Sequence, residues 1–349
     1  MNDLEKLFLS ELESLYQGEK GLAEALPDFE RHARSPDLKS VFREHTEQTR
    51  GHIDRLEQIF REIGETPKEK TCHSLEGIIS EGQAVAKEFE GGSAFDIGII
   101  AAAQKSEHYE MASYSSLYSW AEKLGHDRIA GWLQNNFNQE KETSARLTRL
   151  ARSSSQWGHA QFEKDKLLKD FRRVFFRQVR EMYDAEHLLI SALAELEYYA
   201  ESRLLRFAFA HHRKQTEKHV ENVEKVFKQI GETADRRPCE GIEGIIDDAQ
   251  VYVEEFLGNS ALDSAIIAAA RKAELYEISG YLSLYSSAKE LGENGALPLF
   301  EENLKDERST DRKLNLAANW FRNPKAKHRE STKRFVETAE FLKLATHGS

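Results

Sequence analysis

The sequence lacks the features that support disulfide frameworks, secretion signals and membrane spans. Among its 349 residues are six prolines and two cysteines, and Cys72 and Cys239 alone exclude a disulfide framework. No segment reaches the ~18 apolar residues that a bilayer span requires. The first residues, Met1 to Ser10, carry no long apolar run of the kind found in a signal peptide. We therefore expect a soluble, cytoplasmic protein without a membrane partner.

Acidic and helix-favouring residues are abundant. The formal net charge of -11 argues against a nucleic-acid partner, because like charges repel, and favours a protein that binds cations. Ala, Leu, Glu and Lys are frequent, and Asn-Gly or Asp-Gly turns are scarce. These residues lose little conformational freedom in a helix, so the composition predicts an all-α protein.

An internal repeat organises the chain. Residue n matches residue n+167 without insertion from about Met1 to Ala151. Each copy is long enough to bury its own core. The polar segment around Ser153-Ser154-Ser155 predicts a linker between the copies. We expect copy one at 1–151, a linker at 152–164, copy two at 165–320 and a charged tail at 321–349.

Each copy is expected to contain four long helices and one short helix that crosses between the halves of a bundle. Ser35-Pro36-Asp37 predicts a boundary between the first two helices, and Gly64 and Gly125 predict helix ends. The inward rows follow from spacings of three and four residues. In copy one these rows are Leu12, Leu15, Glu19, Leu22, Leu26 and Phe29; Phe42, His45, Thr49, His52, Leu56, Ile59 and Ile63; Ile100, Ala103, Glu107, Glu110, Tyr114, Leu117, Ala121 and Leu124; and Leu133, Asn136, Glu140, Thr143, Leu147 and Leu150.

Carboxylates occupy these inward rows in both copies. A buried carboxylate needs a partner or a metal ion, because removing an unpaired charge from water costs several kcal/mol. No Lys or Arg lies on the rows. Oxygen ligands combined with imidazole suit Fe, Mn or Zn. The polar groups kept at equivalent positions in the two copies are Glu19 and Glu186, Glu107 and Glu274, Glu110 and Glu277, Glu140 and Glu307, His45 and His212, and His52 and His219.

Four segments of copy one also carry a family resemblance: Tyr16-Gln17-Gly18-Glu19-Lys20, His45-Thr46-Glu47-Gln48-Thr49, the run from Ala101 to Glu110, and Leu117-Tyr118. In these segments the chain resembles a tandem member of the YciF-like family of bacterial ferritin-like stress proteins. The Glu107-x-x-Glu110 pair is similar to the pair in rubrerythrin-type di-iron proteins. The resemblance implies two ferritin-like four-helix bundles, a di-metal centre, a tendency to dimerise and a link to stress. It implies no settled reaction.

The expected ligand set departs from the usual ferritin-like pattern. Thr143 and Thr310 stand three residues after Glu140 and Glu307, where that pattern has a histidine. Glu47 becomes Lys214 in copy two and is assigned to solvent. His45 and Gln48, with His212 and Gln215, remain either ligands or neighbours that hydrogen-bond to ligands. The predicted metal ligands are Glu19, His52, Glu107, Glu110, Glu140, Glu186, His219, Glu274, Glu277 and Glu307.

The leading functional hypothesis is a metal-binding stress protein that handles iron or peroxide at these sites. Iron is the expected metal, with manganese or zinc as alternatives, and dioxygen or peroxide the expected co-substrate. Two rival interpretations need no turnover. The polar groups would form a metal-free network that specifies the core, or the bundle would act in protein association, with the fused copies as an internal pseudo-dimer that also forms homodimers. Glu302, Asp306 and Asp311 in copy two replace Asn135, Gln139 and Ser144, which predicts tighter metal binding there.

Overall fold

The computed structural model describes residues 1–92, 94–153 and 161–320, and within them it contains helices and no β-strand. The all-α prediction is confirmed. Among these residues, no helix combines the length and apolar character needed to cross a membrane. The first repeat contains α1 (Asp3–His32), α2 (Pro36–Ile63), α3 (His73–Glu88), α4 (Phe95–Leu124) and α5 (Asp127–Ser153). The second contains α6 (Gln161–Tyr199), α7 (Arg203–Ile230), α8 (Glu240–Phe256), α9 (Leu262–Leu291) and α10 (Leu297–Trp320).

Helix boundaries in the first repeat follow local sequence signals. Ser35 caps α2 by accepting a hydrogen bond from the Leu38 backbone N–H. Gly64 and Gly125 end α2 and α4 in the left-handed conformation, with φ of 74° and 76°. These stops were predicted. The linker is the exception, because α5 reaches Ser153 and α6 already begins at Gln161. The residues of the expected linker between these helices, and the expected tail at 321–349, lie outside the described residues.

Each repeat forms a bundle of four long helices. In the first repeat α1 packs against α2 and α4, and α5 packs against α2 and α4. The same pattern joins α6, α7, α9 and α10 in the second repeat. The shorter helices α3 and α8 connect the two halves of their bundles and pack against α4 and α9, respectively.

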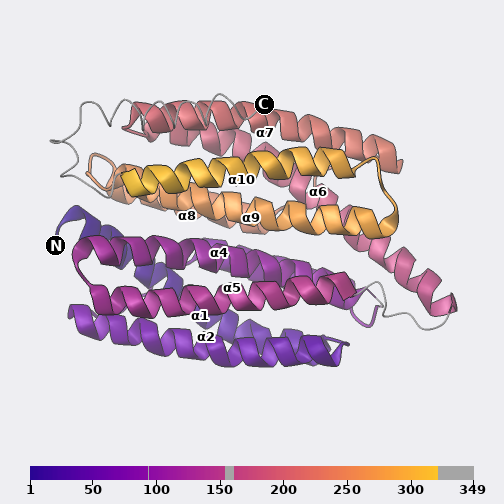
Figure 1. Ribbon diagram of the computed structural model, residues 1–349, viewed down its shortest axis with the longest axis horizontal. Coiled ribbons are helices and arrows are strands. Elements are labelled where there is room, and N and C mark those ends of the chain that lie inside the picture. Colours follow the sequence, from indigo (N-terminus) through magenta and orange to yellow (C-terminus); the bar gives the residue numbers. More distant parts are fainter. Residues whose placement is uncertain (93, 154–160, 321–349) are drawn as a thin grey trace.

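The two repeats pack against each other through α3 on α8 and α4 on α9 (Figure 1). Two equivalent glycines permit the close approach of the short helices. A methyl group on Gly77 would overlap the Glu240 carbonyl oxygen, and one on Gly244 would overlap the His73 carbonyl oxygen. Glycine is required here because the neighbouring backbone occupies the position of a Cβ.

Charged side chains are buried in this inter-repeat interface. Lys105 Nζ lies 2.8 Å from Glu81 Oε2 and donates to the Tyr276 hydroxyl at 2.7 Å. The equivalent Lys272 Nζ lies 2.9 Å from Glu11 Oε2. The ion pairs join α3 to α4 and α1 to α9, so one of them links the two repeats directly.

Candidate metal centre

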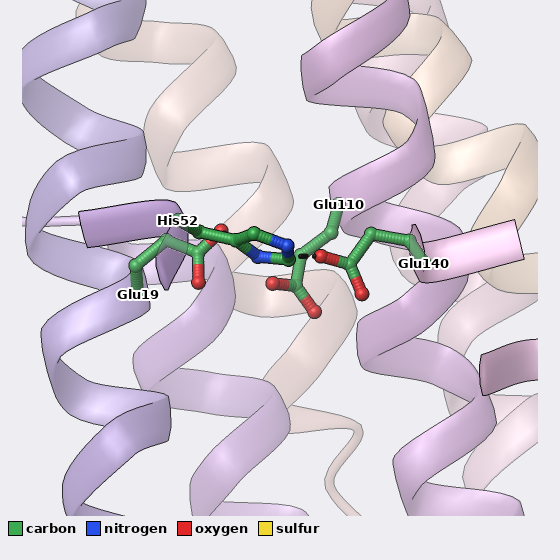
Figure 2. Close-up of side chains that lie close together, drawn as sticks. All are labelled: Glu19, His52, Glu110 and Glu140. Atoms are coloured by element: carbon green, nitrogen blue, oxygen red, sulfur yellow. Dashed lines mark ion pairs between the residues drawn. The ribbon is translucent and has the colours of Figure 1, made fainter. Parts of the chain in front are cut away.

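The inward carboxylates and imidazoles of the first repeat meet midway along the bundle. Glu19 comes from α1, His52 from α2, Glu110 from α4 and Glu140 from α5. Figure 2 shows the four side chains extending from their helices toward a common point. All four are fully buried, as the spacing of the apolar positions on each helix predicted.

His52 connects the carboxylates of opposite helices. Its Nδ1 lies 2.8 Å from Glu140 Oε1 and 3.3 Å from Glu19 Oε1. Its Nε2 lies 3.1 Å from Gln139 Oε1. The Tyr114 hydroxyl donates to Glu19 Oε1, which fixes the position of that carboxylate. One imidazole and three acidic side chains therefore form a first compact group, Glu19, His52, Glu110 and Glu140.

His45, two turns before His52 on α2, belongs to a second group. Its Nδ1 lies 3.2 Å from Glu107 Oε1, and its Nε2 lies 3.5 Å from Glu140 Oε2. Candidate ligand atoms of His45, Glu107, Glu110 and Glu140 lie within 4.8 Å of one another. Glu110 and Glu140 occur in both groups. Two carboxylates shared by two adjacent ligand groups form an arrangement suited to a pair of metal ions.

The second repeat has the same arrangement with differences. His219 Nδ1 lies 2.8 Å from Glu307 Oε1 and 3.4 Å from Glu186 Oε2. His212 Nε2 lies 3.0 Å from Glu274 Oε1. The two compact groups here are Glu186, His219 and Glu307, and His212, Glu274 and Glu307. Only Glu307 is shared, and the buried Glu277 belongs to neither group.

Many buried oxygens at these sites accept no hydrogen bond from the described residues. This holds for both oxygens of Glu107, Glu110, Glu140 and Glu307, although one oxygen each of Glu140 and Glu307 lies 2.8 Å from an imidazole nitrogen. His45 approaches Glu107 without hydrogen-bond geometry. Buried acceptors without donors are strongly unfavourable, and metal coordination would satisfy them. The residues therefore fit a metal centre in donor type, burial and unpaired oxygens.

Electrostatics in the first repeat show excess negative charge. Burial raises the pKa of Glu107 and Glu110 well above their usual value, and the charge of Glu140 adds to the effect. Burial also disfavours the charged form of His52, but the charges of Glu140 and Glu19 outweigh it and raise the His52 pKa to about 10. For Glu140, burial is outweighed by His52 and His45, which lower its pKa. The histidines thus stabilise the negative charge of Glu140, whereas Glu107 and Glu110 have too little positive charge nearby to stabilise theirs.

In the second repeat, burial raises the pKa of Glu274 to about 8 and that of Glu307 to about 7. The pKa of Glu277 is raised well above its usual value by burial and by the charges of Glu307 and Glu186. Burial lowers the pKa of His212, which favours the neutral imidazole able to bind a metal ion. Charge imbalance is therefore common to both repeats.

Thr143 and Thr310 stand where the ferritin-like pattern has a histidine, but each site still contains two imidazoles. Thr310 Oγ1 lies 3.3 Å from His212 Nδ1, and Thr143 Oγ1 donates to Gln48 Oε1 at 3.0 Å. The second imidazole comes instead from the neighbouring helix, as His45 and His212. Gln48 contacts this threonine, which places it as a neighbour of the candidate ligands.

All ten candidate ligands predicted from the sequence are buried, and all but Glu277 belong to the compact groups. The structure adds His45 and His212, whose role the helical spacing left open, because only side-chain distances show that they approach Glu107 and Glu274. Glu47 is exposed beside Arg50, as expected. Asp306, which replaces Gln139 in the second copy, lies 3.5 Å from His219, a contact that the sequence did not predict.

The cysteines and His108 lie outside these clusters. Cys72 and Cys239 are free and buried, with their sulfurs 3.4 and 3.1 Å from the hydroxyls of Tyr109 and Tyr276. His108 Nδ1 contacts the Leu275 carbonyl oxygen across the inter-repeat interface at 3.0 Å. These residues serve packing between helices and repeats.

Comparison with known proteins gives a family and relatives. The family described as "Domain of unknown function (DUF892)" matches residues 3–158 and 170–327. Protein YciF of Escherichia coli strain K12 is 38% identical over 152 residues, which span 43% of this chain and 92% of that protein.

Two solved structures are similar to parts of the chain. The crystal structure of the Escherichia coli stress protein YciF matches with a TM-score of 0.44 and 36% identity, over 45% of this chain and 100% of that chain. YcfI of Rhodopseudomonas palustris, provisionally described as a structural protein, matches with a TM-score of 0.41 and 37% identity, over 42% of this chain and 92% of that chain.

Proposed function

The chain belongs to the DUF892 family, and the stress protein YciF is among its relatives. From that premise we propose that each repeat contains a ferritin-like di-metal centre. The observation that carries the proposal is the set of fully buried carboxylate oxygens in Glu107, Glu110, Glu140 and Glu307 that accept no hydrogen bond from the described residues. Transition-metal ions, with iron first and manganese or zinc next, suit this mixture of oxygen and imidazole ligands.

In the first repeat, one ion would be held by Glu19 and His52 and the other by Glu107 and His45, with Glu110 and Glu140 between them. The Tyr114 hydroxyl orients Glu19, and the Gln139 side chain contacts the second nitrogen of His52. When bound, iron or manganese would supply the one-electron chemistry by which dioxygen or peroxide is reduced, whereas zinc has no redox chemistry. We propose that the protein handles iron or peroxide in the response to stress.

Metal content tests the proposal directly. Protein prepared without a chelator is compared by elemental analysis with the Glu107→Gln/Glu274→Gln variant and with a control, Glu24→Gln/Glu290→Gln, whose glutamates are exposed. We expect near-stoichiometric transition metal in the wild type and the control, and a large loss in the first variant. Wild-type protein without bound metal after anaerobic iron loading would contradict the proposal.

A metal-free network is the second candidate, and the raised pKa values of Glu107 and Glu110 favour it. If both carboxyls hold protons, the remaining acids lie within ion-pair distance of imidazoles, Glu19 of His52 and Glu140 of His45. The protein would then be a non-catalytic bundle acting in structure or association. Oxidase and peroxidase assays of metal-loaded protein separate the candidates, because only a di-metal centre predicts turnover.

A further inference from the structure

The second repeat contains a cavity of about 190 Å³ between α6, α8 and α9. Its walls are mainly aliphatic and include Leu189, Leu193 and Ile245. His212 and Glu274 of the candidate metal centre line it as well, and so does the buried Glu277. Exposed Glu195, Gln250 and Glu254 line its outer part. The cavity therefore leads from the protein surface to the carboxylates of the second repeat.

The equivalent space in the first repeat holds an aromatic ring. Phe29 is the counterpart of Leu196, Gly82 of Ala249, and Ala102 of Ala269, and the three residues of the second repeat all line the cavity. A methyl group on Gly82 would come within 3.0 Å of Phe29 Cζ and 3.7 Å of the Ala102 methyl. The buried Phe29 ring also packs against Phe42, with 6.1 Å between ring centroids.

We propose that this cavity binds a small, uncharged, largely apolar molecule next to the metal centre of the second repeat, and that Phe29 closes the corresponding position in the first. The inference rests on the proposed function for its chemistry, because the bound molecule would meet the carboxylates that hold the metal. The two repeats would then act differently, because the second admits an organic molecule and the first does not.

Size and charge define the class of ligand. An apolar cavity of about 150 Å³ accepts benzene, so this larger cavity fits a substituted benzene or a branched hydrocarbon of similar size. The exposed carboxylates of Glu195 and Glu254 lie in the outer part of the cavity, and they repel anions. One oxygen each of Glu274 and Glu277 accepts no hydrogen bond from the described residues, so a donor group on the ligand would find an acceptor there.

Toluene is a suitable probe, measured by calorimetry or ligand-observed NMR on the full chain. We expect one site per wild-type chain and at least a tenfold weaker affinity in Leu196→Phe, which copies the ring of the first repeat. Phe29→Leu should create a second site. Leu257→Phe, at an exposed position at the end of α8, serves as the control and should bind toluene as the wild type does. Benzoate, which adds a negative charge to the same ring, should not bind.

Several results would overturn the inference: no toluene binding to the wild type, unchanged binding in Leu196→Phe, or benzoate binding as tight as that of toluene. If Leu196→Phe does not fold, Phe29→Leu still decides, since an unchanged single site would contradict the role of Phe29. Metal content is measured in the same samples. Bound metal without toluene binding rejects this inference alone, whereas toluene binding without metal rejects the proposed function.

Discussion

At the scale of single residues, the candidate site depends on carboxylates that share too little positive charge. Replacing Glu107 by Gln keeps the shape and removes a carboxyl group that must take up a proton when the chain folds. We expect the metal-free variant to gain up to about 2 kcal/mol in the free energy of unfolding and to bind less metal. Chemical denaturation with chelator present measures the first effect, with Glu24→Gln as the exposed control. A destabilised metal-free variant would show that Glu107 is already satisfied by protein groups.

The raised pKa values also predict how the stability of the metal-free protein depends on pH. Folded Glu107, Glu110 and Glu277 hold protons that the unfolded chain releases above about pH 4.5. The stabilising charge of His52 is complete below pH 6.5 and is lost as the pH rises through about 10. Both effects have the same sign, so the melting temperature should fall between pH 5 and pH 9.

Thermal melts in chelator measure this slope. The variant with Gln at Glu107, Glu110, Glu274 and Glu277 should have a flatter profile, because its remaining carboxylates no longer take up protons on folding. Metal reverses the trend, since ligands release protons when they bind it and affinity rises with pH. A metal-free melting temperature that rises across this range would contradict the assigned pKa directions.

The two repeats should bind metal unequally. Asp306 lies 3.5 Å from His219, where the first repeat has the neutral Gln139. Of the other two added acids, Asp311 is offset by Arg271 at 2.9 Å, and Glu302 accepts a hydrogen bond from Asn222 at 3.1 Å. We therefore expect Asp306 to account for tighter binding in the second repeat. Titration with Mn²⁺ should show two classes of site that merge in Asp306→Gln, and a single class in the wild type would oppose this.

At the scale of helices, the sequence predicted which face of each helix points into its own bundle, but it did not predict which outer faces the other repeat covers. The apolar row of α2 was read correctly because a single buried stripe recurs every three to four residues. The row of α1 is buried as well, but the residues from Leu7 to Leu15 are buried on all sides of that helix. In α4 the opposite face is buried too, and it carries Lys105 and Tyr109. Nothing in the period of one helix shows that a second bundle covers its other side. The spacing of one helix also cannot show which side chains of other helices lie near His45, so its approach to Glu107 could be found only from the structure.

The contact between α3 and α8 makes a prediction about single methyl groups. Gly244→Ala would place a methyl group on the His73 carbonyl oxygen, so we expect a loss of about 1–3 kcal/mol in the free energy of unfolding. Gly131→Ala is the matched control, because no atom lies within 4 Å of an added Cβ in α5. That change should stabilise by up to about 1 kcal/mol, as alanine favours a helix over glycine. Equal effects at both positions would refute the close helix contact.

At the scale of the whole molecule, the duplication register located two similar bundles but not the surface that joins them. A repeat found by sequence comparison contains no information on how its copies dock. The joining surface combines residues that are the same in both copies, such as Gly77 and Gly244, with residues that differ: Glu11 in the first repeat corresponds to Gln178 in the second. The ion pair that Glu11 forms with Lys272 of α9 therefore has no equivalent on the other side of the interface.

This pair allows a test of how strongly the repeats are coupled. Lys272 and Glu11 are both 1% exposed, and Glu11 Oε2 also accepts a hydrogen bond from Tyr252. Lys272→Met leaves the buried Glu11 carboxylate without its cation, so we expect the free energy of unfolding to fall by about 3–5 kcal/mol. Lys272→Met/Glu11→Met should recover much of that loss, since no unpaired charge remains. Breaking the exposed Arg128–Glu62 pair with Arg128→Met should change stability by less than about 1 kcal/mol.

The double-mutant cycle consists of the wild type, Lys272→Met, Glu11→Met and the double variant. Equilibrium unfolding of these four proteins measures the coupling energy between α1 and α9. A coupling energy near zero would mean that the ion pair contributes nothing to the stability of the contact between the repeats. A large coupling, accompanied by a single unfolding transition that splits into two in Lys272→Met, would mean that the interface makes the two bundles one cooperative unit. We expect the second result, because the pair is buried between elements of different repeats and each partner depends on the other for its charge balance.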